Sequence, residues 1–354
     1  CMYTRVTGIW QTVWMEAVDE EGLKSVFATP DIDQQQLVIR PQFYGQNAAN
    51  KLVVTLYDGK KEVARKSVPC GDGSVVVLPV KGMKLWSPES PFLYGLKYQV
   101  VKDGKVVDEV SSYAGMRKVH LHDGYFYLNN KPYYQRLVLD QGYYPDGLLT
   151  PPSNEAMKFD IEYVKSAGFN MLRKHIKVEP LLWYHYCDVN GIIVWQDMIN
   201  GGGKYGLEIS VIPFVNITLN DNNYSTFHRT DKEGRDLYYQ ELEEIVDTLY
   251  NCPCIALWVP FNEGWGQFDS KKAYDKLKSL DKTRIVDSAS GWHDMGKSDV
   301  ISKHIYFTPI KVKKGNRAYV LSEFGGLGLK LKGHTFNNKM FGYKVFFSRE
   351  SLTE

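Results

Sequence analysis

The sequence lacks any apolar run close to the roughly 18 residues that a membrane span needs, and it has little net charge. Its 43 Lys and Arg residues nearly balance its 41 Asp and Glu residues, which leaves a formal net charge of +2. The basic residues are scattered, so they form no electrostatic footprint for nucleic acid or an anionic membrane. We therefore expect neither a membrane nor a nucleic acid among the partners.

Cysteine is also scarce, and its spacing fits neither a disulfide framework nor a zinc site. We expect the five cysteines to be packing residues: Cys1, Cys70, Cys187, Cys252 and Cys254. This pattern neither requires nor excludes an oxidising compartment. No signal peptide is visible, so the localisation stays open, with the periplasm or secretion as one option.

Several common catalytic signatures are missing as well. No G-x-S-x-G motif supports a Ser-His-Asp triad, and no H-x-x-x-H pair supports a catalytic metal. Gly201-Gly202-Gly203 lacks the strand-to-helix context of a phosphate loop. We expect no cofactor, although a structural or activating metal stays open.

Aromatic residues, in contrast, are abundant. They make up 14% of the 354 residues and include 8 Trp and 24 Tyr. Such a composition suits stacking against sugar rings, but β-sandwiches also use many aromatic residues. The length predicts two or three domains with a sizeable core.

Residues 19–120 have the pattern of an all-β domain. Strand-like runs recur without helical periodicity at residues 36–40, 51–57, 62–68, 74–79, 94–102 and 105–112. Asp58-Gly59 and Asp103-Gly104 fit tight hairpins, because Asp-Gly supports the positive φ that these turns need. About seven short strands in about 100 residues predict an immunoglobulin-like sandwich. We find no residues for chemistry in it and expect a scaffold.

From residue 121 onward, after a short hairpin, strands alternate with helices, which predicts parallel β/α units. We expect strands at residues 134–139, 170–174, 192–196, 255–261, 284–287, 300–306 and 318–323. We expect helices at about residues 154–167, 181–190, 236–250 and 270–280, each with proline, serine or glycine at an end.

Seven such strands make an incomplete eight-stranded (β/α) barrel. Residues after Gly326 hold no convincing eighth strand, and residues 1–18 suggest one or two strands without partners. An open barrel leaves unpaired edges, so we expect the chain to be an excerpt of a longer protein, cut at both ends. The long loop of residues 201–235 is expected to lie over the active face.

Two glutamates dominate the second half of the sequence. Glu263 closes the apolar run 255–261, and Glu323 closes the run 318–323. Active sites of β/α barrels form at the carboxyl ends of their strands. Paired carboxylates at that rim predict the acid and the nucleophile of a retaining glycosidase, which lie roughly 5 Å apart. We assign Glu263 as acid/base and Glu323 as nucleophile, and expect their proximity to keep Glu263 protonated.

Other polar residues end strands at the same predicted rim. Asn262 is expected to hold the sugar 2-hydroxyl and Tyr306 to hydrogen-bond Glu323. Arg173 either orients Glu323 or forms a structural ion pair below the rim, and the two roles are not exclusive. Trp292 is either a platform for a sugar ring or a packing residue. Asp197 is a further candidate for binding sugar hydroxyls. The remaining candidates for substrate binding are Asp140, His175 and His304.

Together these motifs resemble glycoside hydrolase family 2, which contains β-galactosidases, β-glucuronidases and β-mannosidases. Phe261-Asn262-Glu263 is similar to the acid/base motif of that family, and Ser322-Glu323-Phe324-Gly325-Gly326 to its nucleophile motif. Arg173 and His175 fall on its second-strand pattern. Residues 8–16 resemble the last strand of its sugar-binding jelly roll, and residues 85–94 a stretch of its middle domain.

The resemblance covers essentially the whole chain and implies three parts. Residues 1–18 would be the last strand of a truncated jelly roll, residues 19–120 an immunoglobulin-like sandwich, and residues 121–354 a TIM-barrel catalytic domain that lacks its eighth strand. The implied partners are an oligosaccharide or glycoside substrate and the missing jelly-roll and C-terminal barrel segments of the same protein. A homo-oligomer stays open.

The implied activity is that of a retaining exo-β-glycosidase of the β-galactosidase-like branch common in bacteria that degrade polysaccharides. Leu139-Asp140-Gln141 stands where many relatives have Asn or His, and the Asn-Lys-Gly that reads a glucuronate carboxylate is missing. The sugar therefore stays open. The alternatives are a mannosidase, a glucuronidase, an endo-acting enzyme such as a mannanase, or a non-catalytic carbohydrate-binding or scaffold protein.

Overall fold

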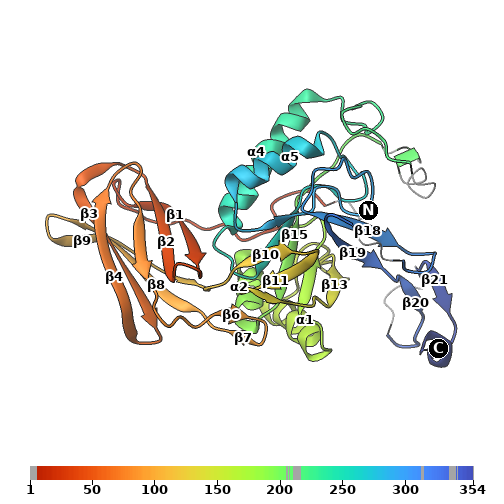
Figure 1. Cartoon of the computed structure of the whole chain (residues 1–354), viewed down its shortest axis with the longest axis horizontal. Coiled ribbons are helices and arrows are strands. Elements are labelled where there is room, and N and C mark those ends of the chain that lie inside the picture. The colour runs from red at the N-terminus through yellow and green to blue at the C-terminus, as the bar shows by residue number, and fades with distance from the viewer. Residues whose placement is uncertain are drawn as a thin grey trace.

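The computed structural model describes residues 6–204, 206, 208–209, 217–311, 315–334, 340 and 342–353. Figure 1 shows two parts side by side along the long axis: a purely β part on the left and a mixed α and β part on the right. Within the described residues, no helix is both long enough and apolar enough to span a membrane.

The N-terminal part consists of two antiparallel sheets that share one apolar core. Its strands are β1 (Leu23–Asp31), β2 (Gln36–Phe43), β3 (Asn47–Asp58), β4 (Lys61–Cys70), β5 (Val76–Pro79), β8 (Tyr94–Lys102) and β9 (Lys105–Ala114). The small hairpin of β6 (Trp86–Ser87) and β7 (Ser90–Pro91) instead packs its Trp86 into the core of the C-terminal part. One sheet has the order β1-β2-β5 and the other β4-β3-β8-β9. Ile39 and Val54, one from each sheet, belong to the same buried cluster. The immunoglobulin-like assignment itself stays a prediction.

The two predicted hairpins are present. Asp103 and Gly104, with φ of 49° and 76°, connect β8 to β9, and Gly59, with φ of 59°, lies between β3 and β4. At Asp103-Gly104 both central residues have positive φ, which matches the right-handed twist of the flanking strands. In the other hairpin Asp58 pairs with Lys61, and only Gly59 of the turn has positive φ.

The C-terminal part contains parallel strands connected by helices. After the antiparallel sheet of β10 (Val119–His122), β11 (Tyr125–Leu128) and β12 (Lys131–Pro132), five parallel strands lie in sequence order: β13 (Leu137–Asp140), β14 (Met171–Lys174), β15 (Ile193–Asp197), β16 (Ile255–Val259) and β17 (Ile285–Val286). A separate parallel pair consists of β18 (Val300–Ile305) and β19 (Ala318–Phe324). All seven predicted strands occur, but within the described residues they do not close into a barrel.

The connecting helices begin and end at residues of the kinds that the sequence predicts. They are α1 (Asn154–Ser166), α2 (Leu181–Asn190), α4 (Lys232–Leu249) and α5 (Ser270–Leu280). The Ser153 side chain caps α1 by accepting the amide of Ala156, and Gly191, with φ of 70°, ends α2. Helix α4 begins earlier than the sequence predicts, because Asp231 caps it by accepting the amides of Glu233 and Gly234.

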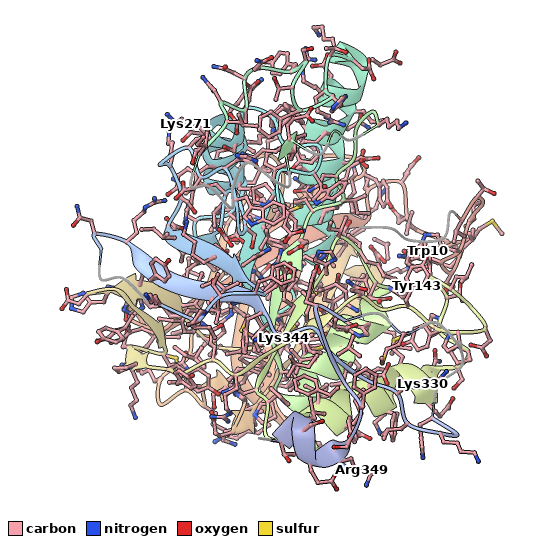
Figure 2. All side chains as sticks on the ribbon, turned by 90° about the vertical axis from the view of Figure 1, so that its right-hand side faces the viewer. Trp10, Tyr143, Lys271, Lys330, Lys344 and Arg349 are labelled. Carbon is pink, nitrogen blue, oxygen red and sulfur yellow. The ribbon has the colours of Figure 1, made fainter. Side chains whose placement is uncertain are left out.

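The first and last segments depart from expectation. Described residues 6–18 form no strand, because no neighbouring strand pairs with them. Instead Gln11 Nε2 donates to the carbonyl of Val178 at 2.7 Å, and Trp10 lies against Lys177. Figure 2 shows Trp10 on the same flank of the molecule as Tyr143. Near the other end, β20 (Leu327–Leu329) pairs in parallel with β21 (Lys344–Phe346), and α6 (Arg349–Thr353) follows.

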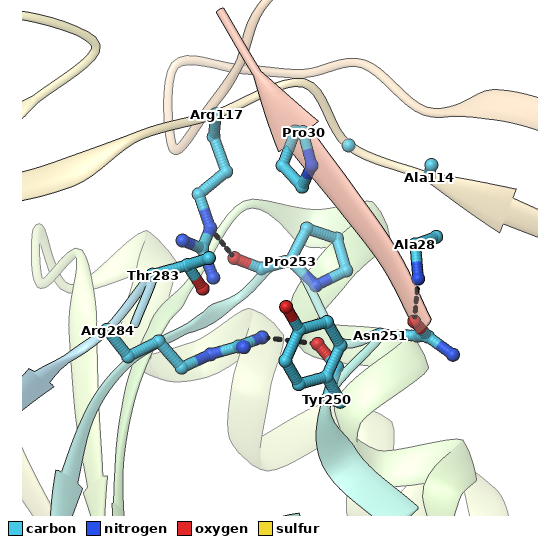
Figure 3. Close-up of a pocket in the computed structure, with 10 residues that line it drawn as sticks. Ala28, Pro30, Ala114, Arg117, Tyr250, Asn251, Pro253, Thr283 and Arg284 are labelled. Carbon is cyan, nitrogen blue, oxygen red and sulfur yellow. Dashed lines mark hydrogen bonds between the residues drawn. The ribbon is translucent and has the colours of Figure 1, made fainter. Parts of the chain in front are cut away.

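The two parts meet at a polar contact around residues 250–255. Asn251 accepts the amide of Ala28 at 2.9 Å, and Arg117 donates to the carbonyls of Pro253 and Ile255. A cavity of about 20 Å³ lies between these groups (Figure 3), which is enough for a single water molecule. This contact ties the sandwich to the beginning of β16.

The cysteines have the expected packing role. All four that the structure describes are free and buried: Cys70, Cys187, Cys252 and Cys254. Burial raises the pKa of Cys187, Cys252 and Cys254 well above the usual thiol value, which keeps them unreactive. Cys1 lies outside the described residues.

Candidate active site

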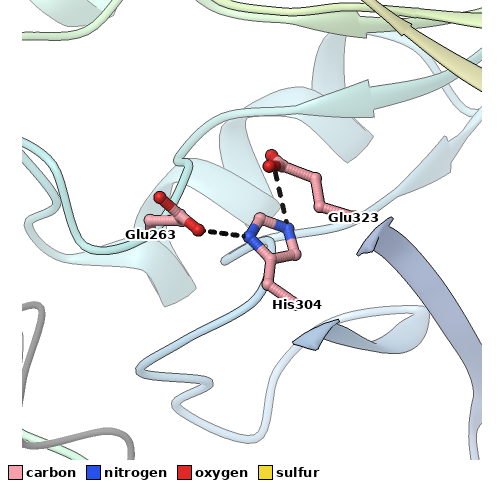
Figure 4. A group of neighbouring side chains, drawn as sticks. All are labelled: Glu263, His304 and Glu323. Carbon is pink, nitrogen blue, oxygen red and sulfur yellow. Dashed lines mark hydrogen bonds and ion pairs between the residues drawn. The ribbon is translucent and has the colours of Figure 1, made fainter. Parts of the chain in front are cut away.

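The two predicted glutamates face each other. Glu263 follows β16, and Glu323 lies near the end of β19. One oxygen of each carboxylate and one ring nitrogen of His304 all lie within 4.8 Å of one another, and Figure 4 shows the imidazole between the two carboxylates. Residues from three strand ends therefore converge on one hollow, as the carboxyl ends of parallel strands do.

Local backbone geometry directs Glu263 into this hollow. Its φ is 51° and that of Gly264 is 73°, in the left-handed region that costs a non-glycine residue free energy. A Cβ atom on Gly264 would lie 2.7 Å from both His293 and Ile209. Only glycine fits there, so the chain can turn sharply directly after Glu263.

Glu323 is surrounded by hydrogen-bond donors. Arg173 Nη1 donates to its Oε1 at 2.9 Å, and the Tyr306 hydroxyl donates to its Oε2 at 2.5 Å. Both contacts were expected from the sequence. They stabilise a negative charge on a side chain that is only 9% exposed.

Arg173 itself is fully buried and contacts Asp197, Asn262, Glu323 and His304. Its Nε and Nη2 donate to the two oxygens of Asp197 at 3.0 and 2.9 Å, and Nη2 also donates to Asn262 Oδ1 at 2.7 Å. Burial opposes its charge, but Asp197 and Glu323 outweigh that effect and raise its pKa. Asp197 is thus engaged below the surface of the hollow, with 1% of its area exposed.

Glu263 is bound to His304 and Tyr306. His304 Nδ1 lies 2.7 Å from its Oε1, and the Tyr306 hydroxyl donates to the same oxygen at 3.0 Å. Burial raises the pKa of Glu263, but these two neighbours lower it more, so the net pKa lies below the usual value. The expectation that the pair of carboxylates keeps Glu263 protonated is therefore wrong for this conformation, because His304, Tyr306 and the charge of Arg173 lower its pKa more than burial raises it.

Asn262 and His175 form a buried pair beside the glutamates. Asn262 Nδ2 lies 3.1 Å from His175 Nε2, which is 3.7 Å from Glu323 Oε1. Burial, and then the charge of Arg173, lower the pKa of His175 to about 2, so the ring is neutral and its Nε2 accepts from the amide. The roles of both residues in sugar binding stay predictions.

Of the remaining predicted residues, Trp292 lies beside His304, whereas Asp140 lies away from the glutamates. Trp292 is half-buried, and its ring centroid lies 6.4 Å from that of His304. Asp140, in contrast, is not brought to the glutamates: its Oδ2 accepts from Lys174 at 2.7 Å. In the β13–β14 register Asp140 pairs with Lys174 and Leu139 with Arg173. Because neighbouring side chains alternate between the faces of a sheet, Asp140 lies on the face opposite Arg173.

The long loop after β15 also reaches this region. Leu219 donates its amide to His293 Nδ1 at 3.1 Å, and the carbonyl of Ile209 lies 3.0 Å from His293 Nε2. His293 thereby connects described residues of the loop to the segment that follows β17. Ile209 of the loop lies next to Gly264, and the predicted position of the loop over the active face stays a prediction.

Tyr343 is a site residue that the sequence did not reveal. Its ring stacks on Tyr306 with centroids 4.1 Å apart and an interplanar angle of 24°. Tyr306 hydrogen-bonds both carboxylates, so the stacked Tyr343 lies at the edge of the site, where burial and the charges of Glu263 and Glu323 raise its pKa. It precedes β21, and no motif or strand periodicity pointed to that short element.

Glu263, His304 and Glu323 offer carboxylate oxygens and an imidazole nitrogen, which are ligand atoms that divalent cations use. Here, however, the guanidinium of Arg173 lies 2.9 Å from Glu323 Oε1 and 3.3 Å from His304 Nε2. A fixed positive charge at that distance would repel a cation. We therefore assign no metal to these residues.

Parallel β/α units that bring two carboxylates together define the architecture of barrel glycosidases. Comparison of the sequence with family models agrees. The model "Glycosyl hydrolases family 2" matches residues 22–117, and the model "Glycosyl hydrolases family 2, TIM barrel domain" matches residues 119–320. The chain belongs to glycosyl hydrolase family 2.

Curated relatives carry two kinds of name. A β-galactosidase of Leuconostoc mesenteroides is 24% identical over 344 residues, which covers 90% of this chain and 31% of the relative. A putative β-glucuronidase of Formosa agariphila is 26% identical over 287 residues, which covers 77% of this chain and 31% of the relative. The chain thus spans about a third of the length of these relatives.

Solved structures show the same fold. A β-D-glucuronidase of Dictyoglomus thermophilum has a TM-score of 0.70 at 17% identity and covers 90% of this chain and 57% of its own. A putative β-galactosidase of Bacteroides fragilis has a TM-score of 0.61 at 22% identity, covering 80% of this chain and 42% of its own.

Proposed function

We propose that the protein containing this chain is a retaining β-glycosidase that removes terminal β-linked sugars. The observation that carries the proposal is the pair of carboxylate oxygens, on Glu263 and Glu323, within 4.8 Å of each other. Retaining enzymes hold their carboxyl groups about 5–5.5 Å apart, whereas inverting enzymes leave about 6.5–9.5 Å for a water molecule. The short separation supports double displacement.

The surroundings of each carboxylate support distinct roles. Glu323 accepts from Arg173 and Tyr306, which favours the anion that a nucleophile must be. Glu263 lies beside the imidazole of His304, a group that can exchange a proton with it. In the proposed reaction Glu323 attacks the anomeric carbon while Glu263 protonates the leaving oxygen. Glu263 then removes a proton from the water that releases the sugar.

We take β-galactosides as the first candidate substrates, within a pathway of bacterial polysaccharide degradation. The relatives named as β-galactosidases support this choice, but those named as β-glucuronidases make β-glucuronides the second candidate. Asn262 and Trp292 would contact the sugar. Action at chain ends, rather than within chains, is part of the proposal.

The proposal for the whole molecule includes the segments outside this chain. We infer that residues 1–18, 19–120 and 121–354 correspond to the end of a jelly roll, an immunoglobulin-like sandwich and most of a (β/α)8 barrel. The missing jelly roll and barrel segment would complete the substrate pocket. The proposed reaction needs no cofactor.

Mechanism-based trapping tests the proposal. The longest natural protein that contains these 354 residues would be incubated with activated 2-fluoro-β-glycosides and digested for mass spectrometry. We expect the label on Glu323, no turnover by Glu323→Ala, and azide rescue of Glu263→Ala with an activated leaving group. Label on another residue would refute the assignment. Sugar binding without hydrolysis of any aryl β-glycoside would favour a non-catalytic carbohydrate-binding protein instead.

A further inference from the structure

A buried ion cluster lies next to the rim loop of residues 141–150, which follows β13. Lys174 donates to Asp140 Oδ2 at 2.7 Å and to Glu179 Oε1 at 2.8 Å, and Lys177 Nζ lies 2.7 Å from the same Glu179 oxygen. Lys174, Lys177 and Glu179 are at most 4% exposed. Two cations and two carboxylates balance each other, as buried charges must. None of the four side chains takes part in the proposed reaction.

Lys177 also holds both ends of the loop. Its Nζ donates to the carbonyl of Gly142 at 2.6 Å and to the carbonyl of Leu149 at 2.8 Å. Together with the Glu179 carboxylate, these carbonyls are three acceptors, and only the ammonium form of lysine has three hydrogens to share among them. One buried side chain, itself fixed by an ion pair, therefore connects the beginning of the loop to its end.

Gly142 allows the loop backbone to come this close to the ammonium. Its φ is 62°, and a Cβ atom at this residue would lie 2.3 Å from Glu179 Oε1 and 2.8 Å from Lys177 Nζ. A residue with a side chain would push the loop away. Tyr144 of the loop also hydrogen-bonds Asp160 of α1. The loop thus has a second attachment, and the loss of Lys177 should loosen it only in part.

Residues of the N-terminal segment cover the lysine. The ring centroid of Trp10 lies 5.1 Å from Lys177 Nζ, a contact between a cation and an aromatic face that is stabilising. The carbonyl of Trp10 accepts from Thr150 Oγ1 at 3.3 Å, and Gln11 Nε2 donates to the carbonyl of Val178 at 2.7 Å. This segment therefore contacts the lysine and the end of the loop at the same time.

The loop borders the candidate active site. The amide of His175 donates to the carbonyl of Asp140, the residue before the loop, at 2.9 Å, and His175 Nε2 lies 3.7 Å from Glu323 Oε1. Ile176 has a φ of 47°, a strained value that persists only where the surroundings hold it. The turn at Ile176 lets His175 contact the proposed nucleophile while Lys177 contacts the loop. Loops that follow barrel strands form the walls of the active site, so the position of this loop affects the substrate.

We propose that Lys177 is a positioning residue that fixes the loop of residues 141–150 as one wall of the sugar-binding site, with Trp10 as its cover. This inference rests on the proposed glycosidase function and deepens it. Lys177 touches no reacting atom and acts through the loop. The loop contacts the sugar equally in the bound substrate and in the transition state, so loss of Lys177 raises KM and leaves kcat unchanged.

The first test compares the kinetics of Lys177→Met with those of the parent, in the longest natural protein that contains these residues and with an aryl β-glycoside. Lys165→Met is the matched control, because Lys165 also donates to two backbone carbonyls, those of Pro88 and Asn190, but lies near the C-terminal end of α1. We expect KM to rise about tenfold in Lys177→Met, as for the loss of one hydrogen bond to a charged group, while kcat changes less than about twofold. Lys165→Met should match the parent.

Cleavage of the native protein by chymotrypsin tests the loop without any turnover. Tyr143 and Tyr144 lie in the loop, and cleavage after them requires local opening. We expect this cleavage to be about tenfold faster in Lys177→Met than in the parent or in Lys165→Met, because it follows the population of the open form. Trp10→Ala should show a smaller increase in the same direction.

Two variants cover the case in which Lys177→Met fails to fold. Trp10→Ala changes no buried charge. The double variant Lys177→Met/Glu179→Gln removes one cation and one carboxylate, so Lys174 and Asp140 remain as a balanced pair. Both should reproduce the rise in KM and the faster cleavage of the loop.

Either an unchanged KM or an unchanged cleavage rate in the variants of Lys177 and Trp10 would overturn the proposal. Equal changes in Lys165→Met would overturn it as well. Complete lack of turnover by the parent protein would instead count against the glycosidase function. In that case the cleavage rates decide whether Lys177 holds the loop, and the Kd of D-galactose, measured by calorimetry, takes the place of KM.

Discussion

Arg173 and Glu323 are joined by a hydrogen bond of 2.9 Å although they lie in different sheets, on β14 and β19. The same guanidinium donates two hydrogen bonds to Asp197 on β15. One buried cation therefore fixes the position of the proposed nucleophile relative to the five-stranded sheet.

Replacing Arg173 by Met should be severely destabilising. The change leaves Asp197 and Glu323 buried without their partner, and breaking a buried ion pair in this way costs about 3–5 kcal/mol. Urea unfolding followed by circular dichroism measures the loss. The control is Arg65→Met, which removes an exposed ion pair with Glu62 and should cost less than about 1 kcal/mol. Equal losses in the two variants would contradict the central role of Arg173.

Tyr306→Phe should reduce turnover without unfolding the protein. The Tyr306 hydroxyl donates to Glu323 at 2.5 Å and contacts Glu263 at 3.0 Å. Hydrogen bonds to charged groups contribute about 1.5–3 kcal/mol, so we expect kcat/KM for an aryl glycoside to fall about 10- to 100-fold. Tyr319→Phe, a change on the same strand as Glu323, is the control and should retain activity. Full activity of Tyr306→Phe would show that the bridging hydroxyl is dispensable.

Gly326→Ala should displace Tyr343. A Cβ atom at residue 326 would lie 2.3 Å from Tyr343 Cδ2, whereas a Cβ atom at residue 325 would meet nothing within 4 Å. Both glycines have positive φ, 68° and 91°, so the two alanine variants bear similar backbone strain. We expect Gly326→Ala to have the higher KM of the two because it loses the stacked wall beside Tyr306. Identical kinetics would mean that Tyr343 does not line the substrate site.

Asp281 should make stability depend on pH in the acid range. Burial raises its pKa, but Arg284, Thr283 and Trp258 together outweigh burial and lower it to about 2. A depressed folded-state pKa gives stability that is present above the unfolded value of about 4 and is lost as the pH falls to about 2. Two pKa units correspond to about 2–3 kcal/mol. Urea unfolding between pH 5 and 2 should show a shallower decline for Asp281→Asn than for the parent, and parallel curves would contradict this account.

The sequence predicted the site well where chemistry and strand ends coincide. Glu263 and Glu323 each close an apolar run, and that pattern alone placed them on one rim. Strand boundaries followed for the same reason: β18 was expected at residues 300–306 and is Val300–Ile305.

The misses have physical causes. Asp140 was placed on the wrong face because the alternation of side chains, counted from Arg173 across the β13–β14 register, was not applied. Tyr343 was missed because its place beside the site depends on its stacking against Tyr306, which is distant in sequence. The lowered pKa of Glu263 arises from His304, 41 residues away in sequence, and no local pattern encodes such a contact.

The sandwich is more than a spacer in this molecule. Arg117, in the connection between the two parts, holds the carbonyls of Pro253 and Ile255, where the strand leading to Glu263 begins. A Cβ atom on Gly115 would press to within 2.7 Å of Pro253, so the seam tolerates no added bulk. A graft of these β/α units onto a sandwich from another relative must keep residues 115–117 and 250–255 together, because a misfit there would displace the strand that leads to Glu263.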